Sequence, residues 1–471
     1  MDAVNGKMTR TEADSIGEKE IDINAYYGVQ SLRGAENFPI TGTMMHPELI
    51  NALALVKKAA AMTNRDSGRM AADKAEAIMQ ACDEVLAGKF RDQFVVDAIQ
   101  GGAGTSANMN ANEVIANRAE EILGGKKGAY TMVHPNDHTN MAQSTNDVYP
   151  SAGKIAAATL LKGLIAEEKR LFAAFMKKAE EFDDVLKMGR TQLQDAVPMR
   201  LGQEFHAYAS AVKRDIAGLE RAEASLHTLN MGATAIGTAI DGDPYYLAHI
   251  CENISKVCGE TYTQCEDLFD GTSNLDVYVR VSSALKAAAV NLSKISNDLR
   301  LMSSGPKTGL AEIALPARQN GSSIMPGKVN PVIPEVVSQV AFKVIGNDMT
   351  IAMAAEAGQL ELNAFEPVIF YSLYEGITAM TGAVKTLIDN CVEGIAANRE
   401  RCEYLMNQSV GIATALKPYI GYGKSAAIAK ESLKTGVPVK DIVLREGLLS
   451  EKELEKILDP HTLTEVSPLD F

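Results

Sequence analysis

The sequence contains no tryptophan, and aromatic residues occupy only 6% of its 471 positions. Strands favour aromatic and β-branched residues, whereas alanine and methionine, which are plentiful here, favour helices. No run of 18 apolar residues occurs, so we expect no membrane span. Because 46% of the residues are hydrophobic, a chain of this length can bury a large core. We therefore expect a mainly α protein.

Basic residues are the minority among the charges. There are 46 Lys and Arg against 60 Asp and Glu, which gives a formal net charge of −14. Nucleic-acid binding needs a basic face, so we expect no nucleic-acid partner. The same balance offers no overall attraction for an anionic small molecule. Any anion site must therefore be made locally, from hydroxyls, amides and one or two cations.

The six cysteines are scattered and form no CxxC pair. We expect them to be reduced residues of a cytoplasmic protein. The stretch Met1–Arg10 has no apolar region of the kind found in signal peptides, which favours the same location. We expect no metal site, because His134 and His138 are the only closely spaced histidine pair and Pro135 opposes a helix between them. No nucleotide-binding glycine motif is complete, so we expect no cofactor.

Long stretches with helical periodicity dominate the middle of the chain. In Asn274–Ser303 the apolar residues alternate at spacings of four and three, which is typical of helices packed side by side in a bundle. Pro334 predicts the start of a helix continuing towards Pro367, roughly 50 Å long. Other stretches predicted to be helical are Pro47–Ala87, Ser151–Phe182 and Leu201–His227.

These patterns predict three domains. We expect an N-terminal domain of helices and loops at residues 1–145, a central bundle of long helices at 146–396, and a small C-terminal domain at 397–471. Helices this long carry more apolar surface than one chain can cover, so we expect the bundles to pack together in a homo-oligomer.

The most informative segment is the signature loop, defined here as residues 318–331. It contains Gly321-Ser-Ser-Ile-Met-Pro-Gly-Lys-Val-Asn-Pro331. Glycine and proline predict a loop with defined turns. Such a loop can bring the hydroxyls of Ser322 and Ser323 close to the ammonium of Lys328 and the amide of Asn330. This combination suits binding a carboxylate and removing a proton beside it.

Three further polar segments contain small hydroxyl and amide side chains. Gly101–Asn110 offers Thr105, and Ser144, Thr145 and Asn146 immediately precede a predicted helix, where donors make a ready anion site. Gly189–Pro198 contains Thr191 and Gln192. N-capping with turn formation is the alternative explanation for Ser144–Asn146. For Gly101–Asn110 the alternative is a phosphate loop, which the missing GxxxxGK(S/T) spacing and lysine disfavour. The shared set of neutral donors suits a carboxylate that gains negative charge.

Together these segments resemble the aspartase/class II fumarase superfamily. The likeness is carried by GGAGTSANMNANEVIANRA, HPNDHTNMAQSTNDVYP, KMGRTQLQDAVPMRLGQEF and GSSIMPGKVNPVIPE, and extends over nearly the whole chain. Fumarases of this class have Thr-His-Leu-Gln where this chain has Thr191-Gln-Leu-Gln194, and Pro331-Val-Ile-Pro-Glu335 is similar to the aspartase branch. Some aspartases do have histidine at the Gln192 position.

The resemblance implies a fold and a reaction. The fold is a three-domain helical fold that assembles as a homotetramer, with each site built from three subunits. The reaction is the reversible deamination of L-aspartate to fumarate and ammonia, without cofactor or metal. Ser322 is implied as the base; Thr105, Ser144, Thr145 and Ser323 as donors to the carboxylate that gains charge; and Lys328, Asn330, Asn146, Thr191, Gln192 and Met325 as further substrate contacts.

Two alternatives remain open at the level of the sequence. A fumarate hydratase would share the fold, although the absence of an imidazole at Gln192 disfavours it. A non-catalytic structural relative would also share the fold, although the complete set of Ser322, Lys328 and Asn330 disfavours loss of activity.

Overall fold

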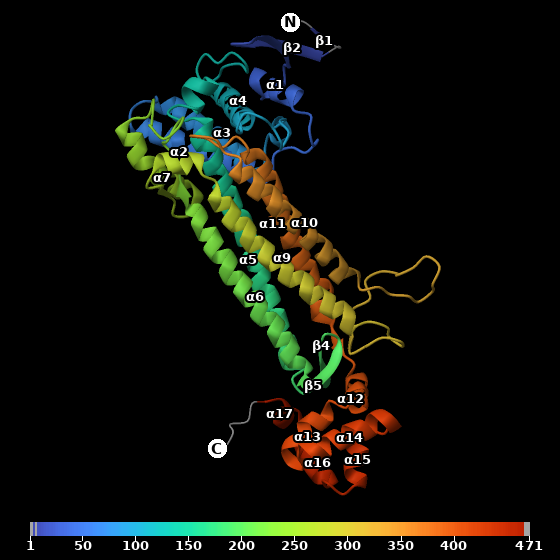
Figure 1. Ribbon diagram of the computed structural model, residues 1–471. Coiled ribbons are helices and arrows are strands. Elements are labelled where there is room, and N and C mark those ends of the chain that lie inside the picture. Colours follow the sequence, from blue (N-terminus) through green and yellow to red (C-terminus); the bar gives the residue numbers. More distant parts are fainter. Residues whose placement is uncertain (1–2, 5–6, 466–471) are drawn as a thin grey trace. The chain divides into compact units, whose positions relative to one another are not determined.

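A computed structural model describes residues 3–4 and 7–465 (Figure 1). These residues are mainly helical, which confirms the predicted fold class. The chain divides into two compact units. The first unit contains Met1–Ile165, Ala217–Ala287 and Lys343–Ala379. The second contains Ala166–Ile216, Ala288–Phe342 and Met380–Phe471. Among the described residues, no helix is long and apolar enough to cross a lipid bilayer.

Five long helices contribute residues to both units. They are α5 (Thr145–Glu181), α6 (Leu201–Ala224), α9 (Asp276–Met302), α10 (Val332–Glu356) and α11 (Glu366–Asn390). Within the first unit, Phe370 of α11 packs on Tyr149 of α5 and Tyr278 of α9, with ring centroids 5.0 and 5.2 Å apart. Within the second, Phe175 of α5 and Phe205 of α6 lie 6.2 Å apart. The predicted bundle of long helices is therefore present.

The first unit also contains a group of shorter helices that positions the polar segments. α2 packs against α3 and α7, and α4 packs against α3 and α1. A three-stranded antiparallel sheet of order β1-β2-β3 lies at its N-terminal end. The bounds are β1 (Ala3–Val4), β2 (Lys7–Asp14), β3 (Gly17–Asp22), α1 (Val29–Asn37), α2 (Pro47–Asp66), α3 (Ala72–Leu86), α4 (Thr105–Ile122), α7 (Pro244–Cys258) and α8 (Leu268–Ser273), with a short parallel pair β6 (Thr228–Leu229) and β7 (Thr263–Gln264).

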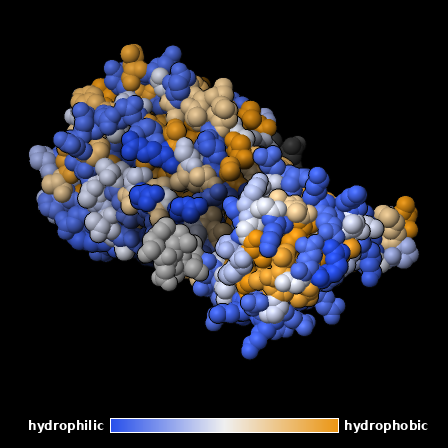
Figure 2. All heavy atoms as spheres, turned by 60° about the horizontal axis from the view of Figure 1, so that its bottom comes forward, coloured by the Kyte–Doolittle hydropathy of each residue, from blue (hydrophilic) through white to orange (hydrophobic). Residues whose placement is uncertain are grey.

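The second unit ends in short helices around a separate apolar core (Figure 1). Leu416, Ile442 and Leu454 are fully buried in this core. Figure 2, which brings these helices forward, shows apolar residues among the polar ones on their surface. The bounds are α12 (Arg399–Gln408), α13 (Ile412–Ile420), α14 (Tyr422–Thr435), α15 (Val439–Arg445), α16 (Glu451–Ile457) and α17 (Pro460–Thr464), with antiparallel pairs β4 (Leu186–Thr191)–β5 (Gln194–Arg200) and β8 (Ile313–Ala314)–β9 (Ala396–Ala397).

Two predicted helical boundaries were wrong. The helix expected to run from Pro334 towards Pro367 ends at Glu356, because the side-chain amide of Asn363 donates to the carbonyls of Ala354 and Ala355 at 2.9 and 3.1 Å. These carbonyls would otherwise accept bonds from a continuing helix. The stretch Pro47–Ala87 is likewise two helices, separated by a turn at residues 67–71.

The expectation that Pro135 excludes a helix was also wrong. Pro135–Thr139 forms a short π-helix with the proline at its first turn, where no intrahelical N–H donor is needed. His134 caps it, and its ring accepts from the backbone N–H groups of Asn136 and Asp137. The two histidines therefore lie at the ends of this turn.

An unusual carboxyl group is buried in the second unit. Glu168 of α5 is fully buried, and neither of its carboxyl oxygens has a hydrogen-bond partner among the described residues. Burial, followed by the nearby negative charge of Asp215, raises the pKa of Glu168 to about 8. The side chain of Asn291 in α9 donates to both oxygens of Asp215 at 2.8 and 2.9 Å. Glu168 is therefore protonated in the folded protein at neutral pH.

This carboxyl predicts a pH-dependent stability. Between its ordinary pKa of 4.5 and about 8, the folded state holds a proton on Glu168 that the unfolded state has lost. The free energy of unfolding should therefore fall as pH rises through this window, by at most about 1.4 kcal/mol per pH unit. Glu168→Gln should remove this dependence in urea unfolding at fixed protein concentration, whereas Glu180→Gln, an exposed control on α5, should retain it. Equal slopes for wild type and Glu168→Gln would contradict the assignment.

Candidate active site

Thr105 is placed by a glycine-rich turn at the start of α4. Gly102 and Gly104 adopt left-handed φ values of 87° and 84°, which favour glycine. A Cβ on Gly104 would lie 2.3 Å from the ring of Tyr149, so only glycine fits against this ring. The hydroxyl of Thr105 donates to the carbonyl of Gly102 at 2.7 Å. Thr105 is exposed at the surface of the first unit.

Ser144, Thr145 and Asn146 form the start of α5 in the same unit. The hydroxyl oxygen of Ser144 accepts from the backbone N–H of Asn146 at 3.2 Å. The hydroxyl oxygen of Thr145 accepts from the side-chain amide of Asn108 in α4 at 3.2 Å, which leaves the Thr145 hydrogen free to donate elsewhere. The amide of Asn146 donates to the carbonyl of Ala235 at 2.8 Å. These contacts tie the two predicted donor segments, α4 and the start of α5, to each other.

The side chain of Asp147 holds the backbone at the start of α5 in place. Its two carboxyl oxygens accept backbone N–H groups from Ser144 at 2.9 Å and from Gly232 and Thr234 at 3.1 Å each. The residue is fully buried, and burial raises its pKa to about 6 against the opposing effect of these three donors and of Lys57. Asp147 therefore connects the start of α5 to the loop at residues 230–238.

A second buried ionisable group lies in the same region. Lys57 of α2 is fully buried, and its ammonium donates to the side-chain oxygens of Asn140 at 2.8 Å and Gln143 at 3.0 Å. Burial lowers the pKa of Lys57 to about 7, although Asp147 and Cys82 oppose this change. Sequence analysis missed Lys57 and Asp147. A lysine on the apolar face of a predicted helix was the available signal for the first.

Thr191 and Gln192 lie on the β4–β5 hairpin of the second unit. Thr191 pairs with Gln194, so Gln192 and Leu193 are the two central residues of the turn. Both have positive φ values, 54° and 61°, as a two-residue hairpin turn requires. Thr191 and Gln192 are exposed. The side chain of Arg190, one residue before Thr191, donates to the buried carboxyl of Glu312 at 2.8 Å.

The signature loop is an exposed segment of the same unit, closed by its own hydrogen bonds. The backbone N–H of Gly321 donates to the carbonyl of Lys328 at 2.7 Å, and the side-chain amide of Asn330 donates to the carbonyl of Gly321 at 2.9 Å. The hydroxyl oxygen of Ser322 accepts two backbone N–H groups, from Ile324 at 3.2 Å and Met325 at 3.1 Å. Two amide donors aimed at one hydroxyl oxygen stabilise negative charge on it.

The structure therefore groups the predicted site residues into two sets. The first unit contains Thr105, Ser144, Thr145 and Asn146. The second contains Thr191, Gln192, Ser322, Ser323, Met325, Lys328 and Asn330. Among the described residues, no three His, Cys, Asp or Glu side chains gather in a group that would hold a metal ion.

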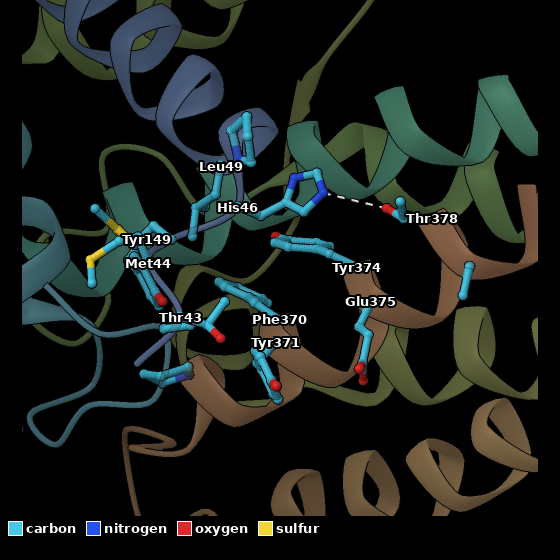
Figure 3. A pocket seen from close by; sticks show the side chains of 15 residues that line it. Thr43, Met44, His46, Leu49, Tyr149, Phe370, Tyr371, Tyr374, Glu375 and Thr378 are labelled. Carbon is cyan, nitrogen blue, oxygen red and sulfur yellow. Dashed lines mark hydrogen bonds between the residues drawn. The ribbon is translucent and has the colours of Figure 1, made fainter. Parts of the chain in front are cut away.

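A separate apolar pocket of about 460 Å³ lies between α2 and α11 in the first unit (Figure 3). His46 and Tyr374 lie along one wall, with ring centroids 5.6 Å apart, and Tyr149 lies at the other end. Burial lowers the pKa of His46, which favours the neutral form of its ring. No predicted site residue lines the pocket. Its contribution to the site is indirect, because Tyr149 supports Gly104 before Thr105.

The contacts of Asp147 generate a test of this geometry. Asp147→Asn replaces one accepting oxygen by an NH₂ group, so at least one buried backbone N–H loses its partner. The free energy of unfolding should fall by about 1–3 kcal/mol. Urea unfolding checks this, with Asp137→Asn as the control because the Asp137 side chain is 75% exposed. An unchanged transition midpoint for Asp147→Asn would show that these bonds do not hold the segment.

Comparison with known proteins gives matches along nearly the whole chain. A family model described as Lyase matches residues 17–346, and one described as Fumarase C C-terminus matches residues 412–465. An aspartate ammonia-lyase from Bacillus sp is 53% identical over 455 residues, which is 97% of each chain. One from Helicobacter pylori strain J99 is 53% identical over 464 residues, covering 98% of this chain and 99% of its own.

Solved structures agree with this assignment. A Brucella melitensis protein described as fumarate lyase:delta crystallin bound to cobalt has a TM-score of 0.95 and 48% identity, covering 98% of this chain and 100% of its own. A class II fumarase from Schistosoma mansoni has a TM-score of 0.91 and 33% identity, covering 96% and 98%. The chain therefore belongs to the aspartate ammonia-lyase family, within the aspartase/class II fumarase superfamily.

Proposed function

We propose that the protein catalyses the reversible deamination of L-aspartate to fumarate and ammonia. This proposal is supported by the relatives named aspartate ammonia-lyase, which are identical to this chain at about half of the aligned positions. The observation that carries the chemistry is the Ser322 hydroxyl oxygen, which accepts two backbone N–H groups within the signature loop. A hydroxyl in this setting can lose its proton more readily than a free serine, as a base requires.

In the proposed mechanism Ser322 acts as its alkoxide and takes a proton from the carbon next to the β-carboxylate, which returns Ser322 to its hydroxyl form. The electrons of the broken C–H bond move into that carboxylate, which becomes a doubly charged aci-carboxylate. They then form the carbon–carbon double bond as the bond to nitrogen breaks and ammonia leaves. The charge is met by the hydroxyls of Thr105, Ser144, Thr145 and Ser323, each worth about 3–4 kcal/mol if it acts as an oxyanion-hole donor.

The remaining polar residues hold the rest of the substrate. Lys328 and Asn330 bind the α-carboxylate, because an ammonium and an amide are its natural donors. Asn146, Thr191 and Gln192 contact the amino group, and Met325 lines the site beside the base. The signature loop, which is exposed and closed by its own bonds, moves over the substrate and excludes water.

The two sets of residues meet in a homotetramer whose sites are shared between subunits. Ile345, Met349 and Met353 support this assembly, since they are spaced four residues apart on α10 and are 39%, 64% and 65% exposed. Aligned apolar residues on one helix face mark a surface that another chain covers. A monomer in solution at micromolar concentration would contradict the assembly.

An assay with and without ammonium tests the function. Purified protein should consume fumarate, followed by its ultraviolet absorbance, only when ammonium is present, and should form L-aspartate. Loss of fumarate in the absence of ammonium would identify a hydratase instead. A folded protein that consumes no fumarate under either condition would overturn the proposed lyase reaction.

Replacement of the proposed base tests the mechanism. Ser322→Ala should lower kcat by at least about a thousandfold, because no other group is assigned to take the proton. The thermal midpoint should not change, since Ser322 lies in an exposed loop. Val329→Ala is the matched control, because Val329 lies in the same loop, is 50% exposed and has no assigned contact with substrate. Turnover by Ser322→Ala close to wild type would rule out this base.

A further inference from the structure

The buried ammonium of Lys57 requires an explanation. It is fully buried and donates to two neutral amide oxygens, those of Asn140 and Gln143. Burying a cation on neutral partners costs several kcal/mol, whereas methionine would fill a similar volume at no such cost. Packing of the fold alone therefore does not explain a lysine at this position. The hydrogen bonds of Lys57 indicate a reason for it.

These contacts lead to the proposed substrate segment in three steps. The side-chain oxygen of Asn140, which accepts from Lys57, also accepts from the amides of Asn108 at 3.2 Å and Asn112 at 3.1 Å. The same Asn108 amide group donates to the hydroxyl oxygen of Thr145 at 3.2 Å. Lys57 is thus connected to Thr145 through two side chains, and Asn108 and Asn112 are buried.

The second acceptor of Lys57 reaches the same segment by its backbone. The side-chain amide of Gln143 donates to the carbonyls of Thr139 and Met141, both at 3.1 Å, and the amide of Asn140 donates to the carbonyl of Gln143 at 3.1 Å. Residues 139–143 are therefore folded around the ammonium immediately before Ser144. The titratable groups that act on Lys57 are Asp147 of α5 and the thiol of Cys82 in α3, whose pKa burial raises to about 12.

We propose that Lys57 is a positioning residue for the lyase reaction: its ammonium, acting through Asn140 and Asn108, aims the Thr145 hydroxyl at the substrate carboxylate. The inference rests on the proposed function, since it assigns Thr145 as a donor to that carboxylate. Because Asn108 occupies the acceptor side of the Thr145 hydroxyl, the hydroxyl hydrogen points away from the network. A donor fixed before reaction stabilises the charge that develops on the substrate.

A double-mutant cycle tests this role. Lys57→Met should lower kcat roughly tenfold to a hundredfold, with a smaller change in KM, because Thr145 acts on charge that appears during reaction. In a Thr145→Val background, Lys57→Met should cause little further loss. A purely structural lysine would instead give independent, additive losses. Lys58→Met is the matched control, because Lys58 lies on the same helix and pairs with Asp83 at 2.5 Å; its kcat should stay within about twofold of wild type.

A second variant distinguishes a loss of folding from a loss of positioning. If Lys57→Met does not fold, as judged by circular dichroism, Asn108→Ala replaces it, since that change breaks the connection to Thr145 and leaves the ammonium its two acceptors. Unchanged kcat in Asn108→Ala or in folded Lys57→Met, or additive losses in the cycle, would overturn the positioning role alone. A wild-type protein that makes no fumarate from L-aspartate overturns the proposed function, and the role with it.

Discussion

The carboxylate of Asp147 is the group on which the first set of predicted site residues depends. By accepting backbone N–H groups from Ser144, Gly232 and Thr234, it joins the start of a long helix to a loop that is remote in the sequence. A buried carboxylate is costly unless donors surround it, so the group and the two segments stabilise each other. Asp147 thereby holds the backbone of Ser144, the residue that precedes Thr145 and the helix.

The charged side chains near these hydroxyls are more deeply buried than the hydroxyls, which are the proposed donors to the substrate. Lys57 and Asp147 are fully buried, whereas Thr145 is only partly buried and neutral. A donor in direct contact with the β-carboxylate stabilises the aci-carboxylate more than the substrate, because that species carries the greater negative charge. Neutral donors held in place by buried charges favour the species that carries extra charge. A chain with a net charge of −14 offers no overall attraction for an anionic substrate. Neutral donors held in place by buried charged residues provide this attraction locally.

Local sequence patterns predicted the helices well where packing and periodicity agree. The apolar stripe of Asn274–Ser303 corresponds to α9, which ends one residue earlier. The stretch after Pro334 was assigned too long a helix, because the contact that ends it comes from Asn363, seven residues beyond the last helical residue. The hydroxyl-bearing segments were recognisable from composition and motif. Lys57 was missed. Its place on an apolar helix face was visible, but its partners come from residues 140–143, and no local pattern reveals contacts across such a separation.

The turn of the β4–β5 hairpin places a predicted site residue in a backbone conformation that its side chain does not favour. Pairing of Thr191 with Gln194 leaves two residues for the turn, and both must adopt positive φ. Asparagine or glycine would relax this backbone, whereas a longer side chain there costs of order 1 kcal/mol. The sequence nevertheless has Gln192 at the first position, with its side chain exposed rather than packed. The exposed amide of Gln192 at the tip of this hairpin is accessible to a ligand, which agrees with the proposed contact between the Gln192 amide and the amino group of the substrate.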